Sequence, residues 1–387
     1  MKKYSFFLLA LFPTLAISAP SPELSTEIDK QVKIAEPEKQ RENLPHLTEE
    51  QSYSTRISRE ELEQNQPLTT QLLSQAIYSR DADLIEKLLE VYQTFPEQDP
   101  ILVLFAQGKV AALNDDQATA IDKYREVLAQ NPNLNPVRIE LAIALFNQKQ
   151  DGAAKAQFDK AKTAEDLPAP VMELIDTYLS ALNERDSWNV DIAFNYVRDT
   201  NVNNVGSGKQ VILANGGVLT RADDMMPQSA HGLAYSRDFN LWGSNYLSVG
   251  NEFFGKSYWD NHEYDDLSNR TFIGYAYKTA KQTFRLKPFY EKRWYGGKSY
   301  RWSNGARVEF SRWLSPNWQL FTAGEFSKQR YLDSTSQNGN NKLISATLLW
   351  ARTPKQFFYL GSDFMAERTK VRQYGSDSKS LRLGWGQ

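Results

Sequence analysis

Few side chains in this sequence have the types and spacing that catalysis or metal binding requires. The three histidines, His46, His231 and His262, lie far apart without the spacing of metal ligands, and we expect each in a loop or on an interior wall. The chain has no cysteine, which excludes disulfides, thiolate catalysis and zinc–cysteine sites. Neither a phosphate-binding glycine loop nor a nucleophile elbow is present. The sequence therefore predicts no enzyme, no cofactor and no metal site.

One polar segment has part of the pattern of a cation site. Asp199, Asn201 and Asn203 have the spacing of the first ligands of a calcium loop. Such a loop needs glycine at its sixth position and glutamate at its twelfth, where this chain has Asn204 and Gln210. We therefore interpret the segment as a polar turn.

The strand that precedes this turn alternates strictly. Five large apolar side chains fall at every second position, and mostly polar residues lie between them: Trp188, Val190, Ile192, Phe194 and Tyr196. Alternation places all five on one face of a strand. Its aromatic ends are about 27 Å apart at roughly 3.3 Å per residue, close to what a tilted membrane strand needs. A half-buried strand of a soluble sandwich remains the alternative.

The rest of the chain favours a membrane barrel. Nine further strands are predicted, at 229–242, 244–258, 267–279, 281–294, 299–314, 317–331, 342–352, 356–370 and 379–386. They are longer than the usual five or six residues, and short turns alternate with long polar loops. All 9 tryptophans lie at or after Trp188. We expect an antiparallel transmembrane barrel over 186–387. Alternating charges on its strands are expected to be solvated wall residues facing the interior, not an active site: Arg285, Lys287, Glu291, Arg307 and Glu309.

The N-terminus has the pattern of an export signal. Lys2 and Lys3 precede an apolar stretch at 4–17, and cleavage is expected after Ser18, which predicts a signal peptide at 1–18. Residues 19–67 are rich in Glu, Lys, Gln, Pro and Ser, which predicts a disordered periplasmic arm, with a short helix near 60–65 as an option. The net charge of −2 suggests no nucleic-acid partner.

Helical repeats are predicted over 68–184. Gly108, Ala120, Tyr124 and Pro132 occupy positions 8, 20, 24 and 32 of a unit that starts at Ile101. The next unit, 34 residues later, repeats positions 8, 20, 24 and 27 with Ala142, Ala154, Phe158 and Ala161. This is tetratricopeptide (TPR) spacing, in which small residues let two helices cross closely and an aromatic ring fills the gap beneath them.

Stacked repeats form a concave surface lined mainly by the first helix of each pair. The candidate client-binding residues on that surface are Phe105, Lys109, Ile139, Ile143 and Asn147. For Ile139 and Ile143 a place in the core is the alternative, and the sequence favours it over a place in the groove. The last helix of this region ends at 183–186, directly before Trp188, which predicts a rigid connection to the first strand.

The junction carries a family resemblance. The segments 178–188 and 198–203, next to TPR-like repeats and an export signal, resemble the surface lipoprotein assembly modulator (Slam) family over about 70–387. The resemblance implies a periplasmic helical domain followed by an outer-membrane barrel of 14 strands. It also implies movement of selected lipoproteins, or of haem- or metal-acquisition proteins, to the cell surface. Expected partners are the client, outer-membrane lipid, periplasmic chaperones and the barrel assembly machinery.

Two points stay open at this stage. Ten strands are counted against 14, and the sequence stops inside a predicted strand at Gln387, which is compatible with a truncated or frameshifted chain or with a smaller barrel. Two other functions also combine helices with a barrel. A polysaccharide exporter would carry more repeats, and a passive porin would need no groove on its helices.

Overall fold

The computed structural model describes residues 57–164, 167–199, 210–212, 218–220, 226–353 and 356–386. The expected signal peptide, His46 and Asn201–Asn204 lie outside these residues. The chain divides into two units. In the first, Met1–Glu36 with Thr200–Asp224, the described part is the strand pair β2 (Gln210–Ile212) and β3 (Val218–Thr220). The second unit, Pro37–Asp199 with Met225–Gln387, contains all other described elements.

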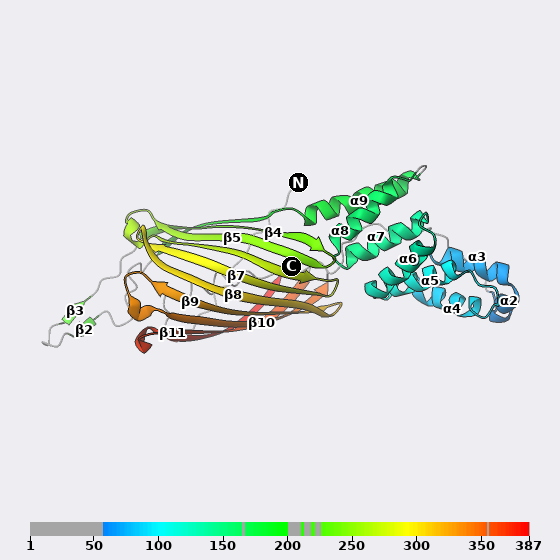
Figure 1. Cartoon of the computed structure of the whole chain (residues 1–387). Helices are drawn as coiled ribbons and strands as arrows, with labels where there is room; N and C mark the ends of the chain where they lie inside the picture. Colours follow the sequence, from blue (N-terminus) through cyan, green and yellow to red (C-terminus); the bar gives the residue numbers. More distant parts are fainter. Residues whose placement is uncertain are drawn as a thin grey trace, which may run out of the picture. The chain divides into compact units, whose positions relative to one another are not determined.

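The described helices follow one another before the sheet (Figure 1). They are α2 (Arg59–Gln64), α3 (Gln66–Ala76), α4 (Ala82–Tyr92), α5 (Pro100–Leu113), α6 (Gln117–Gln130), α7 (Asn135–Asn147), α8 (Asp151–Lys162) and α9 (Ala169–Arg185). None of them is long and apolar enough to cross a membrane.

Helical structure begins earlier than composition predicts. α2 matches the short helix that the sequence allows near 60–65, and α3 starts at Gln66, two residues before the expected start of the helical repeats at 68. The Ser58 hydroxyl accepts a hydrogen bond from the Glu61 N–H, and the Asn65 side chain accepts one from the Leu68 N–H. These two N-caps, with Leu62 packed against the helical core, stabilise helices that composition alone does not indicate.

The repeat positions lie in the core of the helical region. Tyr124 is fully buried and packs edge-to-face against Phe105, with 5.9 Å between ring centroids. Phe158 stacks on Tyr178 at 5.0 Å. The small residues of the repeats, Ala120, Ala142, Ala154 and Ala161, are fully buried, whereas Pro132 is exposed in the turn after α6. Burial raises the pKa of the Tyr124 hydroxyl well above its usual value.

Ten long strands form one antiparallel sheet in which each strand pairs with its neighbours in the chain (Figure 1). They are β1 (Asn189–Asp199), β4 (Met226–Trp242), β5 (Asn245–Tyr258), β6 (Asp266–Lys278), β7 (Gln282–Tyr295), β8 (Lys298–Ser315), β9 (Trp318–Tyr331), β10 (Gly339–Thr353), β11 (Gln356–Thr369) and β12 (Ser376–Gly386). Within the described residues, β1 and β12 are the edges of this sheet, and no pairing closes it. The ten strands predicted are therefore present, and β2 and β3 are additional.

Three strands start three residues earlier than predicted. β4, β10 and β12 begin at 226, 339 and 376, where 229, 342 and 379 were predicted. Asn340 and Asn341 look like loop residues in the sequence, but both pair with β9 and β11, and the Asn341 side chain donates to Gln329 Oε1 at 3.0 Å. Polar side chains thus extend these strands because they face other polar groups across the ladder.

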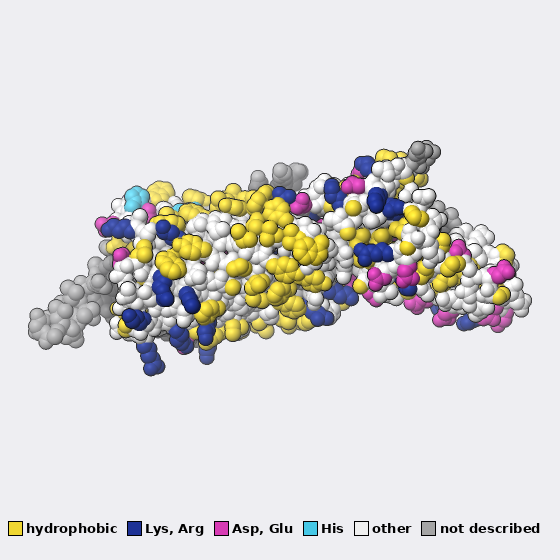
Figure 2. All heavy atoms as spheres, in the orientation of Figure 1, with side chains coloured by type: hydrophobic (Ala, Val, Ile, Leu, Met, Phe, Trp, Pro, Cys, Tyr) yellow, Lys and Arg dark blue, Asp and Glu magenta, His cyan; other side chains and the backbone are white. Residues whose placement is uncertain are grey.

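The two faces of the sheet differ in chemistry. One face, called outward here, carries large exposed apolar side chains, and Figure 2 shows them gathered over the visible surface of the sheet. Ile192 is 79% exposed and Leu383 73%. The opposite, inward face carries polar and charged side chains such as Glu291, Arg301 and Gln329, which are buried among one another. Alternation along the strands produces this division.

The Gly108–Tyr124 contact gives a first testable prediction. A Cβ at Gly108 would lie 2.5 Å from Tyr124 Cε1, so Gly108→Ala should destabilise the helical region by about 1–3 kcal/mol. The loss would appear although alanine is intrinsically favoured over glycine in a helix by about 1 kcal/mol. Urea unfolding followed by circular dichroism measures it. In a Tyr124→Leu variant the destabilisation caused by Gly108→Ala should be smaller than in wild type. Equal destabilisation in the two proteins would show that the Tyr124 ring is not its cause.

Candidate functional site

The predicted client-binding residues do not line an open groove. Phe105, Lys109, Ile139 and Ile143 are buried, and Asn147 is half-buried. The Lys109 Nζ atom forms an ion pair with Glu140 Oε1 at 2.6 Å between α5 and α7. For Ile139 and Ile143 the core role favoured by the sequence is the one observed, because α7 is covered by α6, α8 and α9 and its apolar residues belong to the core on all sides. In the sequence, the run of apolar residues at 139–146, broken only by Glu140, indicates that this helix is buried on all sides.

An open cavity lies on a different part of the repeats. It measures about 350 Å³ and is bounded by α6, α7 and α8. Its rim carries Arg125, Arg138 and Lys160, and Leu128 and Leu141 are part of its apolar lining. No carboxylate lines it. We call this feature the basic cavity. Its mixture of positive charge and apolar surface fits an extended peptide segment with acidic and apolar side chains.

Arg138 is held in place within the basic cavity. Its Nη1 donates to Gln157 Oε1 at 3.0 Å, and its Nη2 donates to the Pro132 carbonyl oxygen. Arg125 and Lys160 are exposed. Sequence reasoning missed the cavity because its residues come from the second helix of one pair and both helices of the next, not from first helices alone.

A polar junction connects the turn between α7 and α8 to the sheet. The Tyr246 hydroxyl lies 2.7 Å from both Asp151 Oδ2 and the Lys149 carbonyl oxygen. Asp151 Oδ1 accepts a hydrogen bond from Arg185 Nη1 at 2.8 Å, and the Arg185 guanidinium lies 3.5 Å from the centroid of the Phe146 ring. One carboxylate thus joins α8, α9 and β5.

Further bonds support the same junction. The Gly152 N–H donates to Asn240 Oδ1 at 3.1 Å, and the Ser244 hydroxyl donates to the Gln148 carbonyl oxygen at 3.1 Å. Asn240 lies two residues before the end of β4, and Ser244 lies in the short turn before β5. The helical region is therefore attached at the end of the sheet where this turn lies. A rigid connection was predicted from α9 alone, and the α7–α8 turn strengthens it.

Each charged residue predicted on the interior wall lies on the inward face and has an ionic partner. Lys287 pairs with Glu309 at 2.9 Å, Arg307 pairs with Glu309 at 2.8 Å, and Arg285 lies 3.5 Å from Asp238. The histidines differ. His262 lies in a 3₁₀ turn with its Nδ1 atom 3.1 Å from Asp265, as expected for a loop residue. His231, expected in a loop or on the interior wall, instead stacks on Phe253 on the outward face, because its position in β4 has outward parity.

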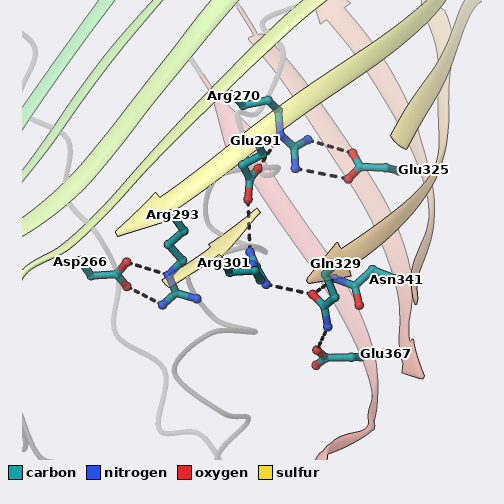
Figure 3. Close-up of polar contacts among 9 residues, drawn as sticks. All are labelled: Asp266, Arg270, Glu291, Arg293, Arg301, Glu325, Gln329, Asn341 and Glu367. Atoms are coloured by element: carbon teal, nitrogen blue, oxygen red, sulfur yellow. Dashed lines mark hydrogen bonds and ion pairs between the residues drawn. The ribbon is translucent and has the colours of Figure 1, made fainter. Parts of the chain in front are cut away.

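A continuous chain of polar contacts crosses the inward face near the ends of the strands (Figure 3). Arg270 Nε donates to Glu291 Oε2 at 2.7 Å, and Glu291 Oε1 accepts from Arg301 at 3.2 Å. Arg301 donates to Gln329 Oε1 at 3.0 Å, and Gln329 donates to Glu367. These residues come from β6, β7, β8, β9 and β11 respectively.

A second ion pair of Arg270 gives information on the curvature of the sheet. Its Nη1 atom forms an ion pair with Glu325 Oε2 at 3.0 Å, and Glu325 lies three strands away on β9. In a flat sheet three strand spacings of about 4.8 Å would separate them by about 14 Å. This separation of about 14 Å is that of the two backbones, and a concave inward face shortens it and favours the direct contact. Arg293 and Asp266 form a two-bond pair beside this chain (Figure 3).

The polar side chains of the inward face connect neighbouring strands through ion pairs and hydrogen bonds, and they make this face hydrophilic. Their charges compensate one another, and within the described residues no group of three or more His, Cys, Asp or Glu could hold a metal ion. A carboxylate flanked by two guanidinium groups, as Glu291 is, serves to hold neighbouring strands in register.

Removing the Glu291 charge tests this bracing. Glu291→Gln leaves Arg270 and Arg301 without a shared carboxylate, and we expect a loss of about 3 kcal/mol in the free energy of unfolding. Urea unfolding followed by tryptophan fluorescence measures it. Asp377→Asn, which breaks the exposed pair of Asp377 with Arg368, is the matched control and should change little. Equal losses in both variants would argue against a bracing role.

Comparisons with known proteins agree with this architecture. The family model described as surface lipoprotein assembly modifier matches residues 188–387, and the model of the N-terminal TPR repeats of the same family matches residues 55–158. Together they cover the sheet and most of the helices.

Curated relatives give the same assignment. A surface lipoprotein assembly modifier of Pasteurella multocida is 36% identical, over 85% of this chain and 66% of its own length. Surface lipoprotein assembly modifier 1 of Haemophilus influenzae is 33% identical, over 100% of this chain and 82% of its own length. A hemophilin secretion modulator of Acinetobacter baumannii is 25% identical, over 76% and 64% respectively. The resemblance seen in the sequence is confirmed, and the chain belongs to the surface lipoprotein assembly modifier family.

Proposed function

We propose that the chain is an outer-membrane translocator that delivers selected lipoproteins, or haem- or metal-acquisition proteins, to the bacterial cell surface. In this proposal the sheet lies in the outer membrane and the helical region lies in the periplasm. The observation that carries it is family membership over both regions, among relatives whose names refer to surface lipoprotein assembly and hemophilin secretion.

The outward face supports a membrane location. Exposed Val190, Ile273 and Leu381 belong to an apolar surface that spans the sheet, and burying each such side chain is worth about 1.5–3 kcal/mol. A soluble protein would leave this surface in water. Apolar residues outward and polar residues inward is the pattern of outer-membrane strands.

The lengths of the connections support the orientation. At the end of the sheet that carries the junction, the described connections are 243–244, 279–281 and 316–317. At the opposite end the connections include 259–265, 332–338 and 370–375, each with a 3₁₀ turn. Outer-membrane barrels have short turns in the periplasm and longer loops outside. The junction would then hold the helices on the periplasmic side.

The basic cavity supports a role in capture. It lies on helices that the junction attaches to the periplasmic end of the sheet, so a client segment bound there would be close to the strands. Arg125, Arg138 and Lys160 would pair with acidic side chains of the segment, and the leucines would bind its apolar ones. No nucleotide is needed for binding of this kind.

Surface display of a client tests the proposal. A lipoprotein encoded next to this chain is co-expressed, and protease shaving of intact cells measures its exposure. Exposure should depend on the protein. In Arg125→Glu/Lys160→Glu it should fall about fivefold or more, the change expected for a loss of about 1 kcal/mol in client binding.

The matched control reverses two exposed lysines outside the cavity, Lys87→Glu/Lys155→Glu, and should keep full display. Display that is independent of the protein while the sheet is present in the outer membrane would contradict translocation of that client. Equal loss in both double variants would point to net charge and not to the basic cavity.

A further inference from the structure

The outward apolar surface ends in a group of cations at the long-loop end of the sheet. Lys and Arg side chains gather beside the hydrophobic surface toward the left of the view in Figure 2. On the outward faces of β7 to β12 this group, called the outer cation cluster, consists of Lys292, Lys328, Arg330, Lys342, Arg368 and Lys379. All but Lys292 are exposed.

Strand register brings the central members together. Asn340 on β10 faces Lys328 on β9 and Arg368 on β11. Lys342 lies two residues further along β10, so it is a diagonal neighbour of both, about 7–8 Å away between Cα atoms. Three cations on three adjacent strands thus surround one small area of the outer surface.

Apart from Arg368, these cations lack the compensation seen on the inward face. There, Arg270, Lys287 and Arg293 each pair with a carboxylate within the sheet. On the described outward faces of β7 to β12, Asp377 is the one carboxylate, and it pairs with Arg368 at 2.6 Å. Lys328 and Lys342 have no carboxylate within ion-pair distance in the described part of the chain. Like charges gathered this closely favour an external anion.

The position of the cluster indicates which anion. Directly below its members on the same strands lie Phe326, Ile344 and Phe364, exposed apolar side chains of the membrane-facing surface. Trp302 lies at the level of the cluster, between Lys292 and Arg330 in the ladder. Aromatic rings and cations at the edge of an apolar band coincide with lipid headgroups. For the outer cation cluster, this is the edge of the apolar surface nearest the longer loops.

We propose that the outer cation cluster binds the phosphate groups of a phosphorylated glycolipid of the outer leaflet, the lipid A type of anionic lipid. The inference rests on the membrane placement in the proposed function. Lys328 and Lys342 supply uncompensated charges to a phosphate, and the apolar side chains below them contact the acyl chains of the same lipid. Arg330 and Lys379 extend the charged area along the sheet.

Lipid binding by the purified full-length chain tests the proposal. The protein is inserted into phosphatidylcholine vesicles and titrated with fluorescent bisphosphorylated lipid A, or with the same lipid after removal of its phosphates. Wild type should bind the phosphorylated lipid about tenfold more tightly. Lys328→Gln/Lys342→Gln should lose this preference, and Lys328→Arg/Lys342→Arg should keep it. Inorganic phosphate at millimolar concentration should not displace the lipid.

The opposite edge of the sheet offers a matched control. Arg312 on β8 and Arg352 on β10 are exposed at the short-turn end, and Arg312→Gln/Arg352→Gln removes the same charge. This variant should retain the preference. Equal affinity of wild type for the two lipids, or equal loss in both glutamine variants, would overturn the proposal. Failure of wild type to insert into the vesicles would instead contradict the membrane placement itself, and the cluster with it.

Discussion

Neighbouring side chains on a strand point to opposite faces, and this rule governs the ten-stranded sheet. In a ladder of ten strands, a shift of one residue in any pairing would exchange the two faces of that strand. Ile192 would then meet the polar interior, and Arg270 would meet the apolar surroundings. The pairing register is therefore determined both by the apolar side chains of the outward face and by the polar contacts of the inward face. Tyr246 at the junction and Lys328 in the outer cation cluster owe their positions to it.

The same rule separates two ways of compensating charge. An inward cation lies on a concave surface, where side chains from strands several positions apart converge, so Arg270 reaches carboxylates on two other strands. An outward cation lies on a convex surface, from which neighbouring side chains diverge. Lys328 and Lys342 therefore depend on ligands from the surroundings. Curvature, together with the scarcity of outward carboxylates, decides which cations the protein neutralises itself.

Much of the fold is predictable from local pattern, because period-two alternation and TPR spacing are visible over short windows. Strands such as β9 and β11 lie within one residue of the predicted bounds, and the repeat residues Tyr124 and Phe158 lie in the core. The candidate site is less predictable. Whether Ile139 faces a groove or the core depends on which helices cover α7, and this depends on contacts between residues far apart in sequence. The basic cavity and the partners of Asp151 arise from such contacts.

The junction has a mechanical consequence. The helical region is attached to the sheet at two separate places, through the chain at Asp186–Trp188 and through the bonds of Asp151 and Gly152 to β5 and β4. The chain connection alone would let the helices swing about residues 186–188, and the second attachment restricts that movement. A force on the helical region would therefore reach the sheet along two paths, through the start of β1 and through the β4–β5 turn.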